Sequence, residues 1–294
     1  MYSIEYNNFE EIIQTKWDIA FVGIHNDDRD KATKEFLTSH ANKLFSIEYN
    51  LEELCLVINN KNVQIHDLAK ELTFCKGNNV IIDATSMTVA EMFLLSKNLY
   101  KLGVTNFDII YVEPKEYTKL EKNFLLSDSG IGFSGAGIPS LAMPFDLEEK
   151  KHIVFLLGYE GDRFADAMDV MQIQPDQVSV VFGIPSYKLN WERNSYAGNL
   201  RVIEDNHLND RFIFCGANNS LAVSRELEVI RKFHDKSQLY IAPIGTKPQA
   251  IGCIPVICQE SNETTVGLLW DHPKRKSGRT TGVSKIQITK GLFT

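Results

Sequence analysis

Short apolar runs alternate with amphipathic segments along the first part of the chain. The apolar runs, rich in valine and isoleucine, cover residues 18–24, 44–49, 80–83 and 107–112, and the amphipathic segments cover 29–39, 63–72 and 88–102. Continuous apolar runs predict strands buried on both faces, and apolar residues three or four apart predict helices that cover those faces. The alternation therefore predicts an α/β fold with mostly parallel sheets.

The same alternation starts again after residue 150. Predicted strands cover 152–158, 178–182, 211–214, 239–242 and 265–270, and predicted helices end near 170 or span 220–233 and 248–256. Residues 118–150 break the pattern, and the Gly- and Ser-rich stretch 127–139 within them is typical of connections that are functional or mobile. We expect residues 1–117 and 151–294 to form two Rossmann-like halves on either side of the connection 118–150.

Short matches between the two halves occur in the same order. Residues 21–24 with Asp28-Arg29 match 155–158 with Asp162-Arg163, residues 82–88 match 241–247, and residues 111–114 match 270–273. Any two Rossmann-like segments share some likeness, but the common order favours an internal duplication.

Charge and cysteine content narrow the classes of function. The chain has 294 residues and a net charge of −7, which argues against a generally basic surface for nucleic acid. We expect no direct contact with DNA or RNA. The exception that the sequence leaves open is the one basic run, with Lys274, Arg275, Lys276 and Arg279, which could bind a polyanion locally or form a solvated loop. The five cysteines form no C-x-x-C pair, so the spacing predicts buried thiols and no metal site.

Several targeting and cofactor signals are missing from the sequence. The N-terminus lacks the basic and apolar segments of a signal peptide, and no apolar run approaches the roughly 20 residues that span a bilayer. We therefore expect a cytoplasmic protein without a membrane anchor. Neither G-x-x-x-x-G-K-[ST] nor a G-x-G-x-x-G that opens a helix is present, so the sequence specifies no cofactor.

The carboxyl ends of parallel strands are where such folds bind ligands, because loops and helix N-termini converge there. The turn with Gly245, Thr246 and Lys247 follows the strand predicted over 239–242. Glycine permits close approach of a backbone, threonine caps a helix and lysine attracts phosphate, while a capped helix with a solvated lysine is the structural alternative. Arg163 is a second phosphate ligand in this prediction, and its alternative is an internal ion pair with Asp162 or Asp166.

The corresponding turn of the first half carries Asp83, Thr85 and Ser86. We expect Asp83 and Thr85 to orient a sugar, although Asp83 could instead cap the next helix or act as a base. If the protein is an enzyme, the acid or base is one of Asp83, Asp27 and Glu113.

Two further polar clusters have both a functional and a structural interpretation. His25 and Asp27 could bind metal or transfer a proton, but their spacing defines no metal geometry and favours a hydrated loop. Tyr187, Trp191 and Arg193 could stack on a base, or they could pack a helix.

A polar turn after the first strand and a Thr/Ser turn before a later helix resemble the CARF domain, in which the later turn often reads T-G-G-T-K. Residues 85–88 and 245–247 are the counterparts in this chain, although the first half has no glycine and no lysine in its turn. Two such units on one chain resemble the SAVED arrangement. The resemblance implies a sensor of small oligonucleotides in prokaryotic antiviral defence.

These observations leave three hypotheses. The first is a binding module that holds a nucleotide-like ligand at the carboxyl ends of the strands and acts through a protein partner. The second is a hydrolase that cleaves a nucleotide or glycosidic bond. The third is a structural subunit of a larger defence complex, in which the polar turns have no ligand. Fold does not choose among them, because function depends on the site.

Overall fold

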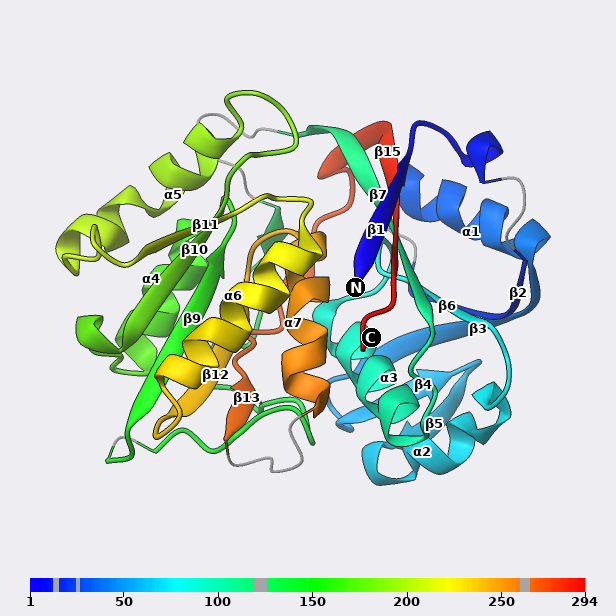
Figure 1. Cartoon of the computed structure of the whole chain (residues 1–294), viewed down its shortest axis with the longest axis horizontal. Helices are drawn as coiled ribbons and strands as arrows, with labels where there is room; N and C mark the ends of the chain where they lie inside the picture. The colour runs from blue at the N-terminus through cyan, green and yellow to red at the C-terminus, as the bar shows by residue number, and fades with distance from the viewer. Residues whose placement is uncertain are drawn as a thin grey trace. The chain divides into compact units, whose positions relative to one another are not determined.

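The chain forms two compact α/β units, shown in a computed structural model (Figure 1). Unit 1 comprises Met1–Thr118 and Lys276–Thr294, and unit 2 comprises Lys119–Arg275. The structure describes residues 1–12, 16–24, 27–118, 126–128, 130–146, 148–259 and 265–293. Within these ranges there are seven α-helices, and none of them is long and apolar enough to cross a membrane.

Unit 1 contains an eight-stranded mixed sheet in the order β1-β15-β7-β6-β2-β3-β4-β5. Its strands are β1 (Tyr2–Tyr6), β2 (Trp17–Val22), β3 (Ala41–Asn50), β4 (Cys55–Ile58), β5 (Lys61–Gln64), β6 (Val80–Asp83), β7 (Asp108–Tyr117) and β15 (Thr280–Lys290). The central strands β3, β2, β6 and β7 are parallel, and the outer strands are antiparallel. Within unit 1, the prediction of a mostly parallel sheet therefore holds only for the four central strands.

Three helices accompany this sheet, namely α1 (Asp28–His40), α2 (Leu68–Glu71) and α3 (Val89–Lys101). A helix predicted over 63–72 is wrong in its first part, because Val63 belongs to β5, which forms a hairpin with β4. Asn59 and Asn60 between these strands both have positive φ, as a tight two-residue hairpin turn requires.

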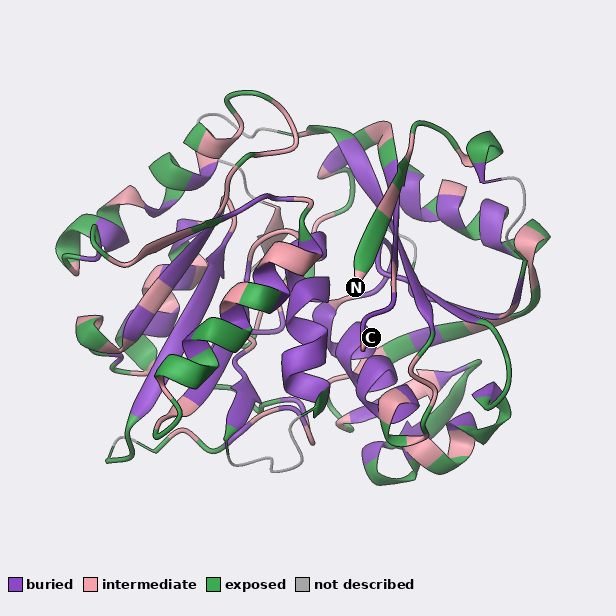
Figure 2. Cartoon of the chain, in the orientation of Figure 1, coloured by how far each residue is buried: buried purple, intermediate pink, exposed green. Residues whose placement is uncertain are grey.

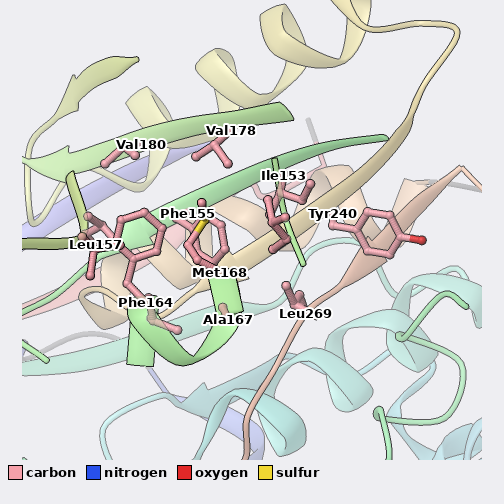
Figure 3. Close-up of a cluster of buried hydrophobic side chains, with 14 of the residues drawn as sticks. Ile153, Phe155, Leu157, Phe164, Ala167, Met168, Val178, Val180, Tyr240 and Leu269 are labelled. Atoms are coloured by element: carbon pink, nitrogen blue, oxygen red, sulfur yellow. The ribbon is translucent and has the colours of Figure 1, made fainter. Parts of the chain in front are cut away.

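Unit 2 contains a five-stranded parallel sheet in the order β11-β10-β9-β12-β13. Its strands are β9 (Lys151–Leu157), β10 (Val178–Gly183), β11 (Phe212–Cys215), β12 (Gln238–Pro243) and β13 (Val266–Leu268), and its helices are α4 (Gly161–Val170), α5 (Glu192–Asp205), α6 (Ser220–Phe233) and α7 (Lys247–Gln259). Apolar side chains of β9 and β10 pack against α4, with Phe155 and Phe164 in ring contact (Figure 3). Strand β9 is buried throughout, whereas α6 alternates between buried and exposed positions (Figure 2).

The end of the chain belongs to unit 1, so the expectation that residues 151–294 form the second half is corrected. Strand β15 pairs antiparallel with β7 and with β1, and Ile286 and Ile288 on it are buried. Many residues of β15 are polar or charged, so it lacks the apolar run that marks the parallel strands.

The described part of the Gly-rich connection packs within unit 2. Strand β8 (Ser127–Asp128) pairs with β14 (Lys274–Arg275), and Phe133 and Met143 lie in the core of the unit. A Cβ on Gly130 would lie 2.1 Å from the carbonyl oxygen of His272, so the chain can pass there only as glycine. Ser129, in the same predicted segment, lies outside the described residues.

Candidate functional site

Both sheets share a central order in which the first parallel strand lies between the second and the third. The order is β3-β2-β6-β7 in unit 1 and β10-β9-β12-β13 in unit 2. Neighbouring connections leave in opposite directions at the β2/β6 and β9/β12 pairs, and in open α/β sheets ligands generally bind at the carboxyl ends of such a pair. The turns predicted to bind a ligand follow β6 and β12, so the structure places each of them at the switch point of its own unit.

A glycine after the first strand fits each switch point closely. A Cβ on Gly23 would lie 2.7 Å from the carbonyl oxygen of Ser86, and a Cβ on Gly158 would lie 2.7 Å from that of Ile244. Contacts this short do not occur for real Cβ atoms, so both positions require glycine for the later turn to pack against them.

In unit 1 the polar residues of this turn are buried and bonded to one another. Asp83 accepts hydrogen bonds from Thr85 N at 2.9 Å and Ser86 Oγ at 2.5 Å. Ser86 Oγ accepts from Gly23 N, and Thr85 Oγ1 accepts from Val112 N. The three side chains therefore join the ends of β2, β6 and β7, rather than pointing to a ligand. The sequence left open that Asp83 caps the next helix. In the structure the cap of α3 is Thr88, so this interpretation is wrong.

Burial raises the pKa of Asp83 to about 6, and the nearby Asp30 carboxylate adds to the shift, while the hydrogen bonds from Ser86 and Thr85 oppose it. Asp83 is completely buried and Asp30 is 1% exposed. The cap of α3 is Thr88, whose N–H donates to the side chain of Glu91.

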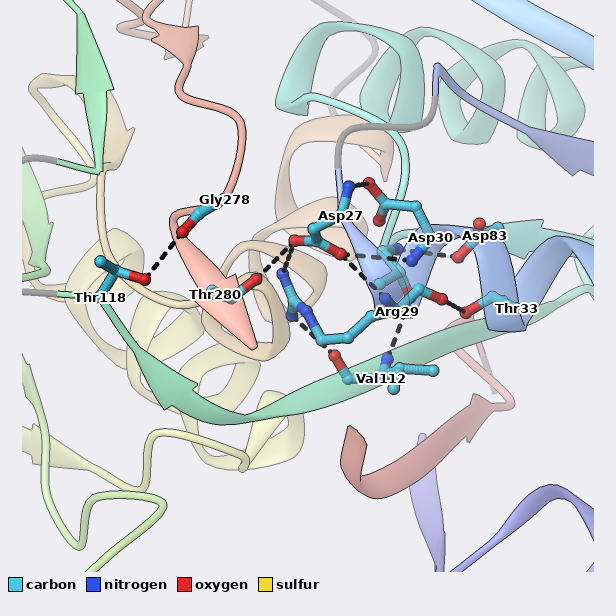
Figure 4. Close-up of polar contacts among 10 residues, drawn as sticks. Asp27, Arg29, Asp30, Thr33, Asp83, Val112, Thr118, Gly278 and Thr280 are labelled. Carbon is cyan, nitrogen blue, oxygen red and sulfur yellow. Dashed lines mark hydrogen bonds and ion pairs between the residues drawn. The ribbon is translucent and has the colours of Figure 1, made fainter. Parts of the chain in front are cut away.

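Asp27 and Arg29 form a buried cluster at the start of α1 (Figure 4). Asp27 caps the helix through the N–H groups of Arg29 and Asp30, and it accepts hydrogen bonds from Arg29 Nη2 at 2.7 Å and Thr280 Oγ1 at 2.6 Å. Burial opposes ionisation of Asp27, but the Arg29 guanidinium and these bonds hold its pKa below the usual value. Arg29 Nη1 also donates to the carbonyl oxygen of Val112, at 2.8 Å.

The remaining acidic candidate of unit 1 is Glu113. Glu113 is 7% exposed on β7. His25 and Asn26 lie outside the described residues. No group of three or more potential metal ligands occurs among the residues that the structure describes.

In unit 2 the turn before α7 is a capping box. Thr246 N donates to Gln249 Oε1 at 3.1 Å, and Gln249 N donates to Thr246 Oγ1 at 3.4 Å. This confirms that a helix begins here with a threonine cap. The Thr246 hydroxyl also donates to the carbonyl oxygen of Ala217 at 2.5 Å, so its proton is already used within the fold.

Three loops meet around this turn. Ala217 N donates to the carbonyl oxygen of Pro185, and Ile184 N donates to that of Cys215. These bonds tie the loops after β10 and β11 to each other, and the Thr246 bond ties both to the start of α7. The result is one continuous polar edge within unit 2.

Gln249 is the residue of this edge that the sequence prediction missed. It is completely buried, and its Oε1 belongs to the capping box, while its Nε2 has no hydrogen-bond partner among the described residues. A Cβ on Gly183 would lie 3.5 Å from that Nε2, which places the amide at the end of β10. The pattern Thr246-x-x-Gln249 was the available signal, since it is typical of a capping box.

Gly245, Thr246 and Lys247 are half-buried, so a ligand can reach them from solvent. Arg163 is held elsewhere in unit 2, since it makes a bidentate ion pair with Asp271 at 2.6 and 2.7 Å and lies over the Trp270 ring. The alternative for Arg163, an internal ion pair, is therefore found, but its partner is Asp271 and neither Asp162 nor Asp166.

The basic run divides between the two units. Lys274 and Arg275 form β14 in unit 2, and Lys276 and Arg279 belong to unit 1. The five cysteines are free and buried, and burial raises the pKa of Cys75 to about 12.

The fold and this edge together define an α/β protein with a parallel sheet and a capped helix N-terminus at its switch point. No protein-family model matches the chain, and no curated protein matches it. The function therefore has to be argued from the geometry of the site alone.

Proposed function

We propose that unit 2 binds a small phosphate-bearing, nucleotide-like ligand at the carboxyl edge of its parallel sheet. The observation that carries this proposal is the amide of Gln249, which is completely buried at the switch point with its donor group unused among the described residues. A buried donor without a partner costs about 1–3 kcal/mol, so an acceptor atom supplied from outside would be stabilising. The phosphate and carbonyl oxygens of a nucleotide are such acceptors.

Two further features support an anionic ligand there. Helix α7 has 13 residues, and its N-terminus carries a partial positive charge that attracts phosphate. Lys247, in the first turn, adds a full charge. The donors of Thr246 are occupied by the cap, so we assign the phosphate to Lys247, Gly245 and Gln249, with Thr246 holding the turn in shape.

The sequence suggested four further residues as ligand-binding, and in this proposal they have a structural role instead. They are Arg163, Asp83, Thr85 and Ser86. Each already bonds within its own unit, so we treat them as residues that hold the edges in shape. Asp27 and Asp83 are likewise engaged, and we therefore propose binding, with output through a protein partner, rather than hydrolysis.

We also infer that the two units are related by duplication of a Rossmann-like element. In unit 1 the arginine near the start of the first long helix, Arg29, donates to Val112 on β7. In unit 2 Arg163 lies in the first turn of α4, as Arg29 lies in the first turn of α1. It pairs with Asp271, just after β13. Since β7 and β13 are the fourth strands of the shared central orders β3-β2-β6-β7 and β10-β9-β12-β13, one architecture accounts for both contacts. A role in prokaryotic antiviral defence rests on the CARF and SAVED resemblance.

The experiment is a thermal unfolding series of the full chain with nucleoside mono-, di- and triphosphates, cyclic oligonucleotides and NAD. A ligand at 100 times its Kd adds about 2.7 kcal/mol, which raises the Tm of a unit of this size by roughly 5–10 °C. We expect Lys247→Ala and Gln249→Glu to abolish the rise, since Glu retains the oxygen that caps Thr246 but lacks the NH₂ group.

Lys236→Ala is the matched control, because it removes the same charge from an exposed position just before β12, at the opposite edge of the sheet. The ligand should be recovered intact by chromatography. Recovery of a hydrolysed product would favour the enzyme hypothesis. If no member of the panel raises the Tm, or if Lys236→Ala acts like Lys247→Ala, the proposal is wrong.

A further inference from the structure

The loop between β10 and α5 follows a parallel strand, at the same carboxyl edge of the sheet as the proposed phosphate site, and it contains the aromatic side chain of Trp191. Ser186 Oγ donates to Lys188 O and contacts the Glu192 carboxylate at 2.5 Å, and Trp191 N donates to Lys188 O at 3.0 Å. Asn190 has a φ of 72°, which closes a tight turn before α5. These bonds fix the backbone on both sides of Trp191.

This loop starts at the polar edge described above. Pro185, its second residue after Gly183, accepts the hydrogen bond from Ala217 N, and Ala217 in turn accepts from Thr246. Gly183 lies against the buried amide of Gln249. The loop is thus continuous, through two hydrogen bonds, with the turn that opens α7.

The ring of Trp191 already receives a cation on its face. Lys188 Nζ lies 5.0 Å from the ring centroid, and both residues are half-buried. A lysine above an indole marks a ring face that is electron-rich and reachable from solvent. Stacking of a nucleobase on an aromatic ring is generally the stronger of the two interactions, so a base can replace the lysine there.

We propose that Trp191 is the stacking platform for a planar base of the ligand, and that Lys188 leaves the ring when the base arrives. This inference rests on the proposed function and names its ligand class as a nucleotide with a free base, rather than any phosphate ester. Lys188, once displaced, remains within the same loop, where its charge favours an anionic ligand.

The test compares ribose 5-phosphate with AMP, GMP, CMP and UMP on the full chain, by equilibrium titration. Ribose 5-phosphate has the sugar and the phosphate but no base, so the ratio of its Kd to that of a mononucleotide isolates the base. We expect at least one mononucleotide to bind about 10-fold more tightly than ribose 5-phosphate. Trp191→Leu should remove this gain and leave the Kd of ribose 5-phosphate unchanged, while Trp191→Phe should keep most of it.

Two accompanying measurements follow the ring and the lysine directly. The chain has three tryptophans, so the difference in emission between wild type and Trp191→Phe isolates Trp191, and the bound base should quench it. Lys188→Met should retain at least the wild-type ratio of affinities, because the base then displaces no cation.

The outcomes separate the two proposals. If ribose 5-phosphate binds in a Lys247-dependent way and the mononucleotides bind no more tightly, the stacking inference is overturned and the proposed function stands. An unchanged ratio in Trp191→Leu overturns the inference in the same way. If neither kind of probe binds, the stacking inference is overturned, and the proposed function is overturned with it when the wider ligand panel also leaves the Tm unchanged.

Discussion

Asp83 provides a direct test of the view that the turn of unit 1 is structural. The substitution Asp83→Asn keeps the size of the side chain and removes its ionisation. Burial, with the Asp30 carboxylate close by, raises the pKa of Asp83 to about 6, whereas an unfolded chain has an aspartate pKa of about 3.9. Between these two values the folded protein binds more protons than the unfolded one, so its stability falls as the pH rises.

The magnitude follows from the pKa difference. About two units at 1.36 kcal/mol each give roughly 3 kcal/mol of stability, present below pH 4 and lost once the pH exceeds 6. The Asn variant lacks this loss. Its free energy of unfolding, relative to wild type, should therefore rise by about 3 kcal/mol between pH 3.5 and 7.5. Any constant cost of the altered bond to Ser86 cancels in this comparison.

Urea unfolding at several pH values measures this difference. Trp17 is buried in unit 1, so a background in which Trp191 and Trp270 are phenylalanine makes it the reporter of that unit. The low pKa of Asp27 produces the opposite slope, but both proteins contain it and the difference removes it. A relative stability that stays flat from pH 3.5 to 7.5, or that changes with the opposite sign, would refute the assignment of a structural Asp83 with a raised pKa.

Further predictions concern unit 2. Burial, together with His234 and Arg211 nearby, lowers the pKa of His152 to about 4. The neutral ring therefore stabilises the fold at neutral pH, and this stability is lost as the pH falls from 6.5 to 4. His152→Phe should reduce the loss by about 2–3 kcal/mol, as measured by urea unfolding at acid pH. Arg163→Met should lower the free energy of unfolding by about 2–3 kcal/mol, because it leaves Asp271 unpaired, and it should have little effect on the ligand Kd. A double-mutant cycle with Asp271→Asn should show coupling between the two residues. A large loss of affinity would instead show that Arg163 contacts the ligand. Gly158→Ala should cost about 1–3 kcal/mol and weaken binding, because its Cβ displaces the turn before α7, and an unchanged Tm and Kd would contradict this.

The α/β class and most parallel strands could be predicted because a buried strand leaves a clear signal in the sequence. The run 152–158 corresponds to β9, which is buried along its whole length. The sequence did not indicate β15, since polar and charged residues interrupt its apolar ones and even the buried run 286–289 contains Gln287 and Thr289. Nor did it indicate that a distant antiparallel strand completes unit 1, because pairing between segments more than 160 residues apart is a property of the tertiary structure.

The candidate site was predicted in its location but not in its bonding. Residue types at a strand end suggest a ligand, yet the same types also satisfy buried backbone groups, and only the coordinates distinguish the two. Asp271 shows this for Arg163, since it lies 108 residues away in the chain. The match that aligned residues 21–24 with 155–158 was also displaced by one residue at the strand ends, since Gly23 follows β2 directly and Gly158 follows β9.

The two switch points differ in how their polar residues are bonded, and this difference supports the proposal that unit 2 binds the ligand. In unit 1 the turn holds Asp83, Thr85 and Ser86, which are buried and bonded to the adjacent strands. In unit 2 the equivalent turn contains Gly245, Thr246 and Lys247, which are only half-buried. The amide donor of Gln249 has no hydrogen-bond partner in the described part of the chain. A buried donor of this kind is rarely retained without a use, because filling the position with an apolar side chain would relieve its cost. The turn of unit 1 therefore joins strands of the fold, whereas the proposed binding site of unit 2 rests on the amide donor of Gln249.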